Sequence, residues 1–132
     1  MSKAILLTLS VLLGSLAWAD DFHDNMEKAG KAVGTLRKAL PAKSMSDVTA
    51  AAAVLAEVLP KTVAKWEELK RPDAVTMAKE IADLAKELKM AADAGHAEHV
   101  QEVFGKMGGK CKGCHDVHRE KLPDGKYKIK GI

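Results

Sequence analysis

Apolar residues recur at intervals of three and four along most of the chain, the spacing that places them on one face of an α-helix. Between Phe22 and Leu40, six apolar positions follow each other at intervals of four and three in strict alternation. Four stretches of this kind predict four helices. These helices are expected over 22–40, from Ser44 or Ser46 to Leu69, over 72–94, and over a fourth stretch that contains Val100 to His118.

Turn-forming residues support these boundaries. Pro41 ends the first helix, Pro72 and Asp73 form a good start for the third, and Gly95 is a natural end for it. Pro60 falls inside the second stretch, so we expect that helix to be kinked or interrupted there. No segment after residue 19 alternates with period two, so no strands are expected. The sequence predicts an all-α fold, an antiparallel up-down-up-down four-helix bundle.

The first 19 residues are typical of a secretory signal peptide. Lys3 gives a short positive start, residues 4–16 are nearly all apolar or small, and Ala17-Trp18-Ala19 forms a cleavage pattern. The apolar run is shorter than the roughly 20 residues that cross a bilayer, which argues against a membrane anchor. We therefore expect residues 1–19 to be cleaved and the rest of the chain to be periplasmic, without an anchor.

The remaining chain divides into a helical domain, residues 20–121, and a basic tail, residues 122–132. Pro123 and the pair Asp124-Gly125 predict a turn, and alternating lysines follow it. We expect this tail to leave the bundle as a turn and an extended, solvated end.

Composition limits the kind of domain. The chain has 132 residues, of which 47% are apolar, 30% charged and 4% aromatic, with two cysteines. These values fit one soluble domain and exclude a scaffold stabilised by several disulfides. Few large aromatic side chains are available for the core. Another large apolar group is expected to fill it.

Cys111-Lys112-Gly113-Cys114-His115 has the C-x-x-C-H pattern of covalent c-type haem attachment. Cysteines at i and i+3 stand one helical turn apart, so two thiols can add to the two vinyl groups on one edge of a porphyrin. His115 can place an imidazole nitrogen on the iron from one side. The motif predicts one haem c, anchored at Cys111 and Cys114, with His115 as the proximal iron ligand.

Three other interpretations of the two cysteines are weaker. A thioredoxin-like redox pair belongs beside a βαβ unit and at a helix N-terminus, whereas this pair lies deep inside a helical stretch. A zinc site needs four ligands, and only scattered histidines accompany the cysteines. A disulfide between i and i+3 closes a loop too small to constrain the chain.

The opposite face of the iron takes a second ligand or stays open for a small molecule. Met26 is the candidate because it lies on the apolar face of the first helix and its thioether is flexible, although most such methionines are core residues. His23, one turn earlier, is the main rival. Weaker candidates are Met45 and Met77, Met90 off its helix face, Met107 on the haem-bearing helix, His118 on the same side as His115, and His96 and His99, expected to be solvated.

These features together resemble the class II cytochromes c, the cytochrome c-prime family. The resemblance rests on the signal peptide, the four helices and a C-x-x-C-H near the C-terminus of the last one, and covers nearly all of residues 20–121. It implies that Arg119 contacts a haem propionate, while His118 stands where the family has an aromatic residue. Met26, Gly30 and Lys31 resemble the start of the low-spin, six-coordinate members, which implies Met26 as the distal ligand.

Positive charge gathers around the motif. Residues 106–132 hold eight basic and three acidic side chains, whereas residues 20–105 are net acidic. This asymmetry can steer an acidic redox partner protein to the haem edge, or it can be a merely solvated lysine-rich end. The basic residues are not interleaved with aromatic residues, so the pattern does not favour nucleic-acid binding. A homodimer is possible.

The expected function is single-electron transfer by a mono-haem cytochrome, a carrier and not an enzyme. The first alternative is a five-coordinate protein that binds nitric oxide or carbon monoxide. The second is a domain that works only inside a larger redox complex. One bundle can host all three functions, so the fold alone does not separate them.

Overall fold

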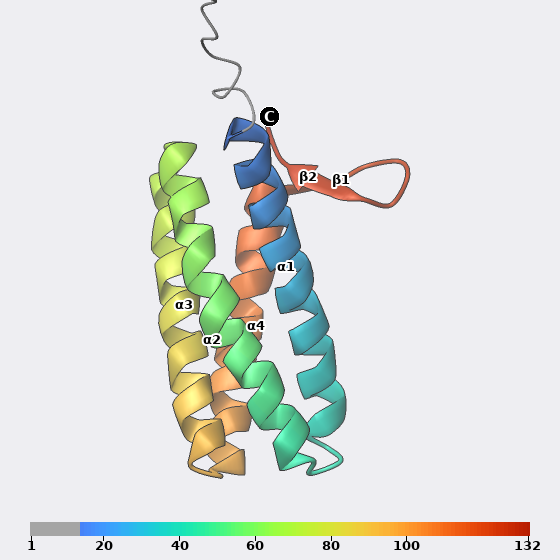
Figure 1. Cartoon of the computed structure of the whole chain (residues 1–132), viewed down its shortest axis with the longest axis vertical. Helices are drawn as coiled ribbons and strands as arrows, with labels where there is room; N and C mark the ends of the chain where they lie inside the picture. The colour runs from blue at the N-terminus through green and yellow to red at the C-terminus, as the bar shows by residue number, and fades with distance from the viewer. Residues whose placement is uncertain (1–13) are drawn as a thin grey trace, which may run out of the picture.

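The computed structural model describes residues 14–132, and the helices form an antiparallel up-down-up-down bundle (Figure 1). The predicted fold class is confirmed. Most of the predicted signal peptide, residues 1–13, lies outside the described residues, and residues 14–19 belong to the first helix. The helices are α1 (Gly14–Ala39), α2 (Met45–Glu68), α3 (Pro72–Asp93) and α4 (Ala97–His118).

Each of the three connections between helices contains one residue with positive φ. These are Lys43, Lys70 and Gly95, with φ of 55°, 56° and 73°. After each of them a backbone N–H bonds the carbonyl five residues earlier, as from Ser44 to Ala39 at 3.0 Å. This is the Schellman arrangement, which normally takes glycine at the left-handed position. Two of the three helix ends therefore use a lysine where glycine fits best.

The main core runs along the bundle and is built mostly from small and aliphatic side chains. Leu36, Leu55, Leu88 and Met107 are fully buried in it. A second cluster of Trp66, Ala74 and Ala78 lies where α1 begins and α4 ends, and partly buried Phe22 and Ile129 pack against it. A buried tryptophan, Trp66, thus lies at the end of the bundle that carries the C-x-x-C-H motif.

Helix α2 continues through Pro60, so the interruption that the sequence allowed does not occur. A proline inside a helix costs about 3 kcal/mol because it lacks an N–H and crowds the preceding turn. Val58, Leu59 and Thr62 around it are all buried. Packing of these residues against neighbouring helices holds α2 together.

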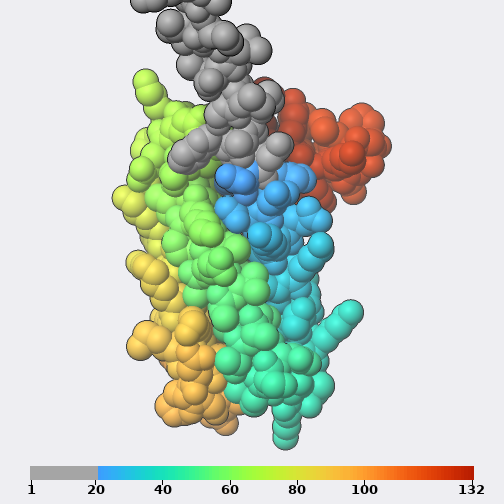
Figure 2. All heavy atoms as spheres, viewed as in Figure 1, coloured from blue at the N-terminus to red at the C-terminus, as the bar shows by residue number. Residues whose placement is uncertain are grey.

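The C-terminal segment corrects one expectation, the absence of strands, while nearly all of the tail is exposed as predicted. Strands β1 (Arg119–Lys121) and β2 (Tyr127–Ile129) form an antiparallel hairpin that stands out from the bundle (Figure 1; Figure 2). The turn predicted at Pro123 to Gly125 is present and joins them. The Arg119 guanidinium lies 3.8 Å from the centre of the Tyr127 ring, and Lys130 N donates to the His118 carbonyl. These cross-strand contacts return the tail to the bundle.

None of the helices in the described part of the chain combines the length and apolarity needed to cross a membrane.

Candidate haem-binding site

The C-x-x-C-H motif lies in the last two turns of α4. Cys111 is partly buried, Cys114 is buried, and neither forms a disulfide. His115 is partly buried. Since positions i, i+3 and i+4 share one side of a helix, the two thiols and the imidazole lie on adjoining parts of one face.

Burial sets the protonation of these groups. Burial raises the pKa of the Cys111 thiol, and Cys114 adds a smaller increase. Burial also raises the pKa of the Cys114 thiol, and the nearby negative charge of Asp73 raises it further. Burial lowers the pKa of His115, and the positive charge of Arg119 lowers it further. The imidazole is therefore held neutral, the form that binds iron.

One side of α4 faces α3. Lys110 Nζ contacts Glu80 Oε2 at 2.7 Å, and Met77 Cε lies 3.5 Å from where a Cβ on Gly113 would be. His99 pairs with Glu87 of α3 in the same row. The opposite flank carries Phe104, Cys111 and His115, which are partly buried and spaced seven and four residues apart. In a bundle of this topology that flank faces α1.

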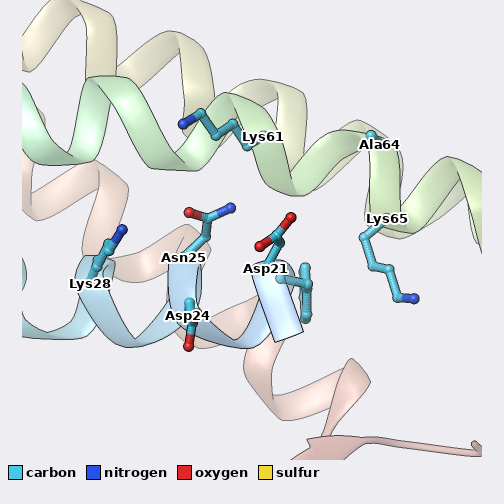
Figure 3. Close-up of a pocket in the computed structure, with 8 residues that line it drawn as sticks. Asp21, Asp24, Asn25, Lys28, Lys61, Ala64 and Lys65 are labelled. Atoms are coloured by element: carbon cyan, nitrogen blue, oxygen red, sulfur yellow. The ribbon is translucent and has the colours of Figure 1, made fainter. Parts of the chain in front are cut away.

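Helix α1 also has two distinct flanks. Asp21 and Asn25 point toward α2, where they line a groove of about 440 Å³ together with Lys28 and Lys61 (Figure 3). The other flank of α1 carries a partly buried row spaced at four and seven residues. This row consists of Phe22, Met26, Val33 and Leu40. Met26 belongs to this row and is not among the residues that line the groove, whereas Phe22 at the start of the row also contacts Trp66 of α2.

The interface between α1 and α4 is the least closely packed one between neighbouring helices of the bundle. Close packing joins α1 to α2, α2 to α3 and α3 to α4, whereas α1 and α4 do not approach to the same extent over their described lengths. Both the N-terminal half of α1 and the C-terminal half of α4 lie at the same end of the bundle (Figure 1). The two cysteines and the neutral histidine lie in the C-terminal half of α4, and the Met26 thioether lies in the N-terminal half of α1.

The other ligand candidates lie elsewhere. His23 is exposed, as are His96 and His99. Met90 is 72% exposed, and Met107 is fully buried in the main core on α4 itself. Met45 and Met77 are partly buried against the core, Met45 in the first turn of α2 and Met77 on α3 beside the motif.

His118 is buried and has polar contacts on both ring nitrogens. Its Nε2 lies 2.8 Å from Asp73 Oδ2, and its Nδ1 lies 3.4 Å from Arg71 Nη1. Its ring centre is 5.2 Å from that of Trp66. The sequence analysis missed this network, because it took Asp73 only as a helix start. The signal in the sequence for this network was the pair of charged residues, Arg71 and Asp73, on either side of Pro72.

Arg119, expected to contact a propionate, is the first residue of β1. It is exposed and stacks on Tyr127. Its charge is nevertheless near enough to His115 to lower the pKa of that imidazole. The guanidinium therefore lies at the outer edge of the candidate site.

Comparison with known proteins agrees with this geometry. The family described as Cytochrome C' matches residues 53–119, which include the motif. A cytochrome c' from Pararhodospirillum photometricum is 33% identical over 93 residues, covering 70% of this chain and 69% of the relative. The chain belongs to the cytochrome c' family. A cytochrome c' from Alcaligenes xylosoxydans xylosoxydans is 47% identical over 34 residues, 26% of this chain and 27% of that protein. No solved structure matches significantly.

As a cytochrome c', the protein is a mono-haem c-type cytochrome, and its cofactor is covalently attached haem c with iron. The residues at the α1–α4 interface fit this group. Free thiols one turn apart and a neutral imidazole are the donor set that attachment requires. Among the described residues, no group of three or more His, Cys, Asp or Glu side chains could hold a metal ion, so the zinc interpretation has no ligand set there.

Proposed function

We propose that this cytochrome c' is a periplasmic carrier of single electrons, and not an enzyme. Cys111 and Cys114 anchor the haem by thioether bonds, His115 binds the iron on the proximal side, and Met26 binds it on the distal side. Bound haem supplies the one-electron chemistry of its iron. The chain orients the group, shields it from water and adjusts its potential.

One observation carries the proposal. Met26 and His115 lie in partly buried rows of α1 and α4, in the halves of these helices that share one end of the bundle, and this pair of neighbouring helices is the least closely packed. His115 and Met26 would supply the two protein ligands of a haem iron held there. A thioether ligand favours the ferrous state and raises the potential, which suits reversible electron transfer.

Charge at the hairpin supports an acidic redox partner. Lys121, Lys126 and Lys130 are exposed there, close to the end of α4 that bears the motif. Several lysines of α4 are paired instead, such as Lys110 with Glu80 and Lys112 with Asp116. The hairpin is therefore the part of the basic region that a partner protein with acidic side chains can reach.

A homodimer through α1 and α2 is also part of the proposal. The groove between these helices carries carboxylates at Asp21 and Asp24 and amines at Lys28, Lys61 and Lys65. A face with both charges can pair with its own copy about a two-fold axis. Light scattering on the purified holoprotein measures the mass directly, and a monomer at all concentrations contradicts this assignment.

Optical spectroscopy tests the ligand set. The holoprotein is expected to show low-spin spectra in both redox states and a far-red sulfur-to-iron band when oxidised. Met26→Ala should turn the spectrum high-spin and open the iron to carbon monoxide. Met90→Ala is the matched control, since this methionine is 72% exposed, and should change nothing.

High-spin spectra in both redox states of the wild type would contradict ligation by Met26 and favour the alternative function, gas binding at a five-coordinate iron. An unchanged low-spin spectrum in Met26→Ala would instead direct attention to His23. The two outcomes are distinguishable because only the first concerns the unmodified protein.

A further inference from the structure

The indole nitrogen of Trp66 lacks a hydrogen-bond partner. Trp66 is 3% exposed, and its Nε1 is the one fully buried side-chain nitrogen or oxygen without a partner among the residues that the structure describes. A buried donor left unpaired is destabilising, and buried tryptophans normally find an acceptor. This atom therefore requires an explanation.

The neighbours of the indole offer no acceptor. The Phe22 ring of α1 meets it edge to face, with ring centres 5.4 Å apart, and cannot accept a conventional hydrogen bond. The His118 ring of α4 lies 5.2 Å away, but its two nitrogens face Asp73 and Arg71. An indole N–H can only donate, so Nε1 needs an acceptor that these neighbours do not supply.

Trp66 lies within reach of the cofactor. It extends from α2 to contact side chains of both α1 and α4, the two helices that border the candidate haem site. His118, which it contacts, follows Cys114 by one turn on the same face, a rise of about 6 Å along the helix. A porphyrin tethered at Cys111 and Cys114 spans at least this distance.

We propose that Trp66 Nε1 donates a hydrogen bond to one of the two haem propionates. The propionates are the strong acceptors on a macrocycle whose rim is otherwise apolar. A carboxylate that is partly withdrawn from water needs donors, and a charge-assisted hydrogen bond is about twice as strong as a neutral one. The exposed Arg119 can serve the other propionate at the outer edge of the site.

This hydrogen bond has a measurable electrostatic effect. A donor to the ionised carboxylate lowers the propionate pKa, so its removal raises that pKa. An ionised propionate near the iron favours the ferric state, and the reduction potential falls as pH rises through the propionate pKa. Without the Trp66 donor, this fall must move to higher pH.

The experiment compares Trp66→Phe with Val63→Ala in the covalently assembled holoprotein. Val63 is partly buried in the same cluster but has no polar side-chain atom, so it controls for lost packing. We expect the potential-against-pH curve to shift to higher pH in Trp66→Phe and to match the wild type in Val63→Ala. Both variants should stay low-spin, which separates this test from that of Met26. Identical shifts in the two variants, or none in Trp66→Phe, would overturn the proposal.

A second measurement needs no variant to fold. In ferrous wild-type holoprotein, the Trp66 indole N–H resonance should be protected from solvent exchange. Its chemical shift should move over the same pH range as the potential. Fast exchange, or a resonance that does not change over this range, contradicts a bond to a propionate. This second measurement decides even if Trp66→Phe fails to assemble.

Discussion

The Nε2 atom of His118 lies 2.8 Å from Oδ2 of Asp73, which joins the last turn of α4 to the first turn of α3. Arg71 contacts the other ring nitrogen, and a guanidinium can only donate, so Nδ1 accepts and Nε2 donates to the carboxylate. Arg71 also donates to the carbonyl of Lys130 in the tail. One buried histidine thus connects α3, α4 and the C-terminal segment at the haem-bearing end of the bundle.

This contact predicts acid sensitivity. Desolvation raises the pKa of Asp73, but the backbone N–H of Ala74 and the His118 ring lower it by more, so the net shift is below 3.8. A carboxyl whose pKa is depressed in the folded state contributes stability above its unfolded pKa and loses it as pH falls through the folded value. Asp73→Asn should unfold at a lower temperature near neutral pH and lose less stability on acidification. Thermal melts of the wild type and of Asp73→Asn, followed by circular dichroism from neutral to acid pH, test this expectation.

The alanine-rich core predicts a strong contrast between neighbours on α2. Leu55 is fully buried, so Leu55→Ala should lower the free energy of unfolding by about 2–5 kcal/mol through lost burial and a cavity. Val54, the preceding residue, is 36% exposed, and Val54→Ala should change stability by no more than about 0.5 kcal/mol. Urea denaturation of the holoproteins measures both values. Similar losses in the two variants would place the core boundary elsewhere.

The lysines in left-handed conformation predict a stabilising substitution. A non-glycine residue in this region costs about 1–2 kcal/mol, partly offset by the greater chain entropy of an unfolded glycine. Lys43→Gly should therefore raise the free energy of unfolding by up to about 1 kcal/mol. Lys38→Gly, in the last turn of α1, should lower it by about 1 kcal/mol. Chemical denaturation distinguishes the opposite signs.

Removal of the thioether anchors should show how much the core depends on the cofactor. Cys111→Ala together with Cys114→Ala should release the haem under denaturing extraction, measured by haem staining after electrophoresis. Because the aromatic content is only 4%, we expect the haem-free chain to keep helical circular dichroism but to unfold with poor cooperativity and bind a hydrophobic dye. A haem-free chain that melts sharply would refute a cofactor-dependent core.

The exposed hairpin predicts a salt-dependent exchange rate with an acidic redox protein. Lys121→Glu with Lys126→Glu should slow electron exchange by about tenfold or more at low ionic strength, and added salt should reduce the difference. Lys38→Glu with Lys43→Glu makes the same charge change at the opposite end of the bundle. This control should leave the rate nearly unchanged. Equal effects from both pairs would indicate that only the net charge matters.

Local spacing in the sequence was sufficient for much of this protein. The intervals between apolar residues predicted four helices, and their observed ends lie within a few residues of the predicted ones after the first. The C-x-x-C-H motif could be located because its chemistry depends on neighbours one turn apart on a single helix. The roles of Cys111, Cys114, His115 and Met26 in holding haem remain predictions that the experiments above address.

Short-range patterns did not reveal the hairpin, and they left open whether the helix is kinked or interrupted at Pro60. The hairpin has few apolar residues and is held by cross-strand contacts, such as Arg119 on Tyr127, that no periodicity announces. A proline inside a helix predicts a kink or a break because its energetic cost is local. The packing that outweighs this cost in α2 comes from other helices. Both outcomes reflect interactions that form only after the chain has folded back on itself.

The sequence by itself determined the number of helices, their apolar faces and the motif for haem attachment, because each depends on residues within one or two helical turns. Only the tertiary structure decided that α1 and α4 pack less closely than the other neighbouring helices, that Asp73 meets His118 from 45 positions away, and that the Trp66 donor is buried without a partner. These relationships depend on how the helices rotate and pack against one another, which is set by the sum of many contacts distant in sequence.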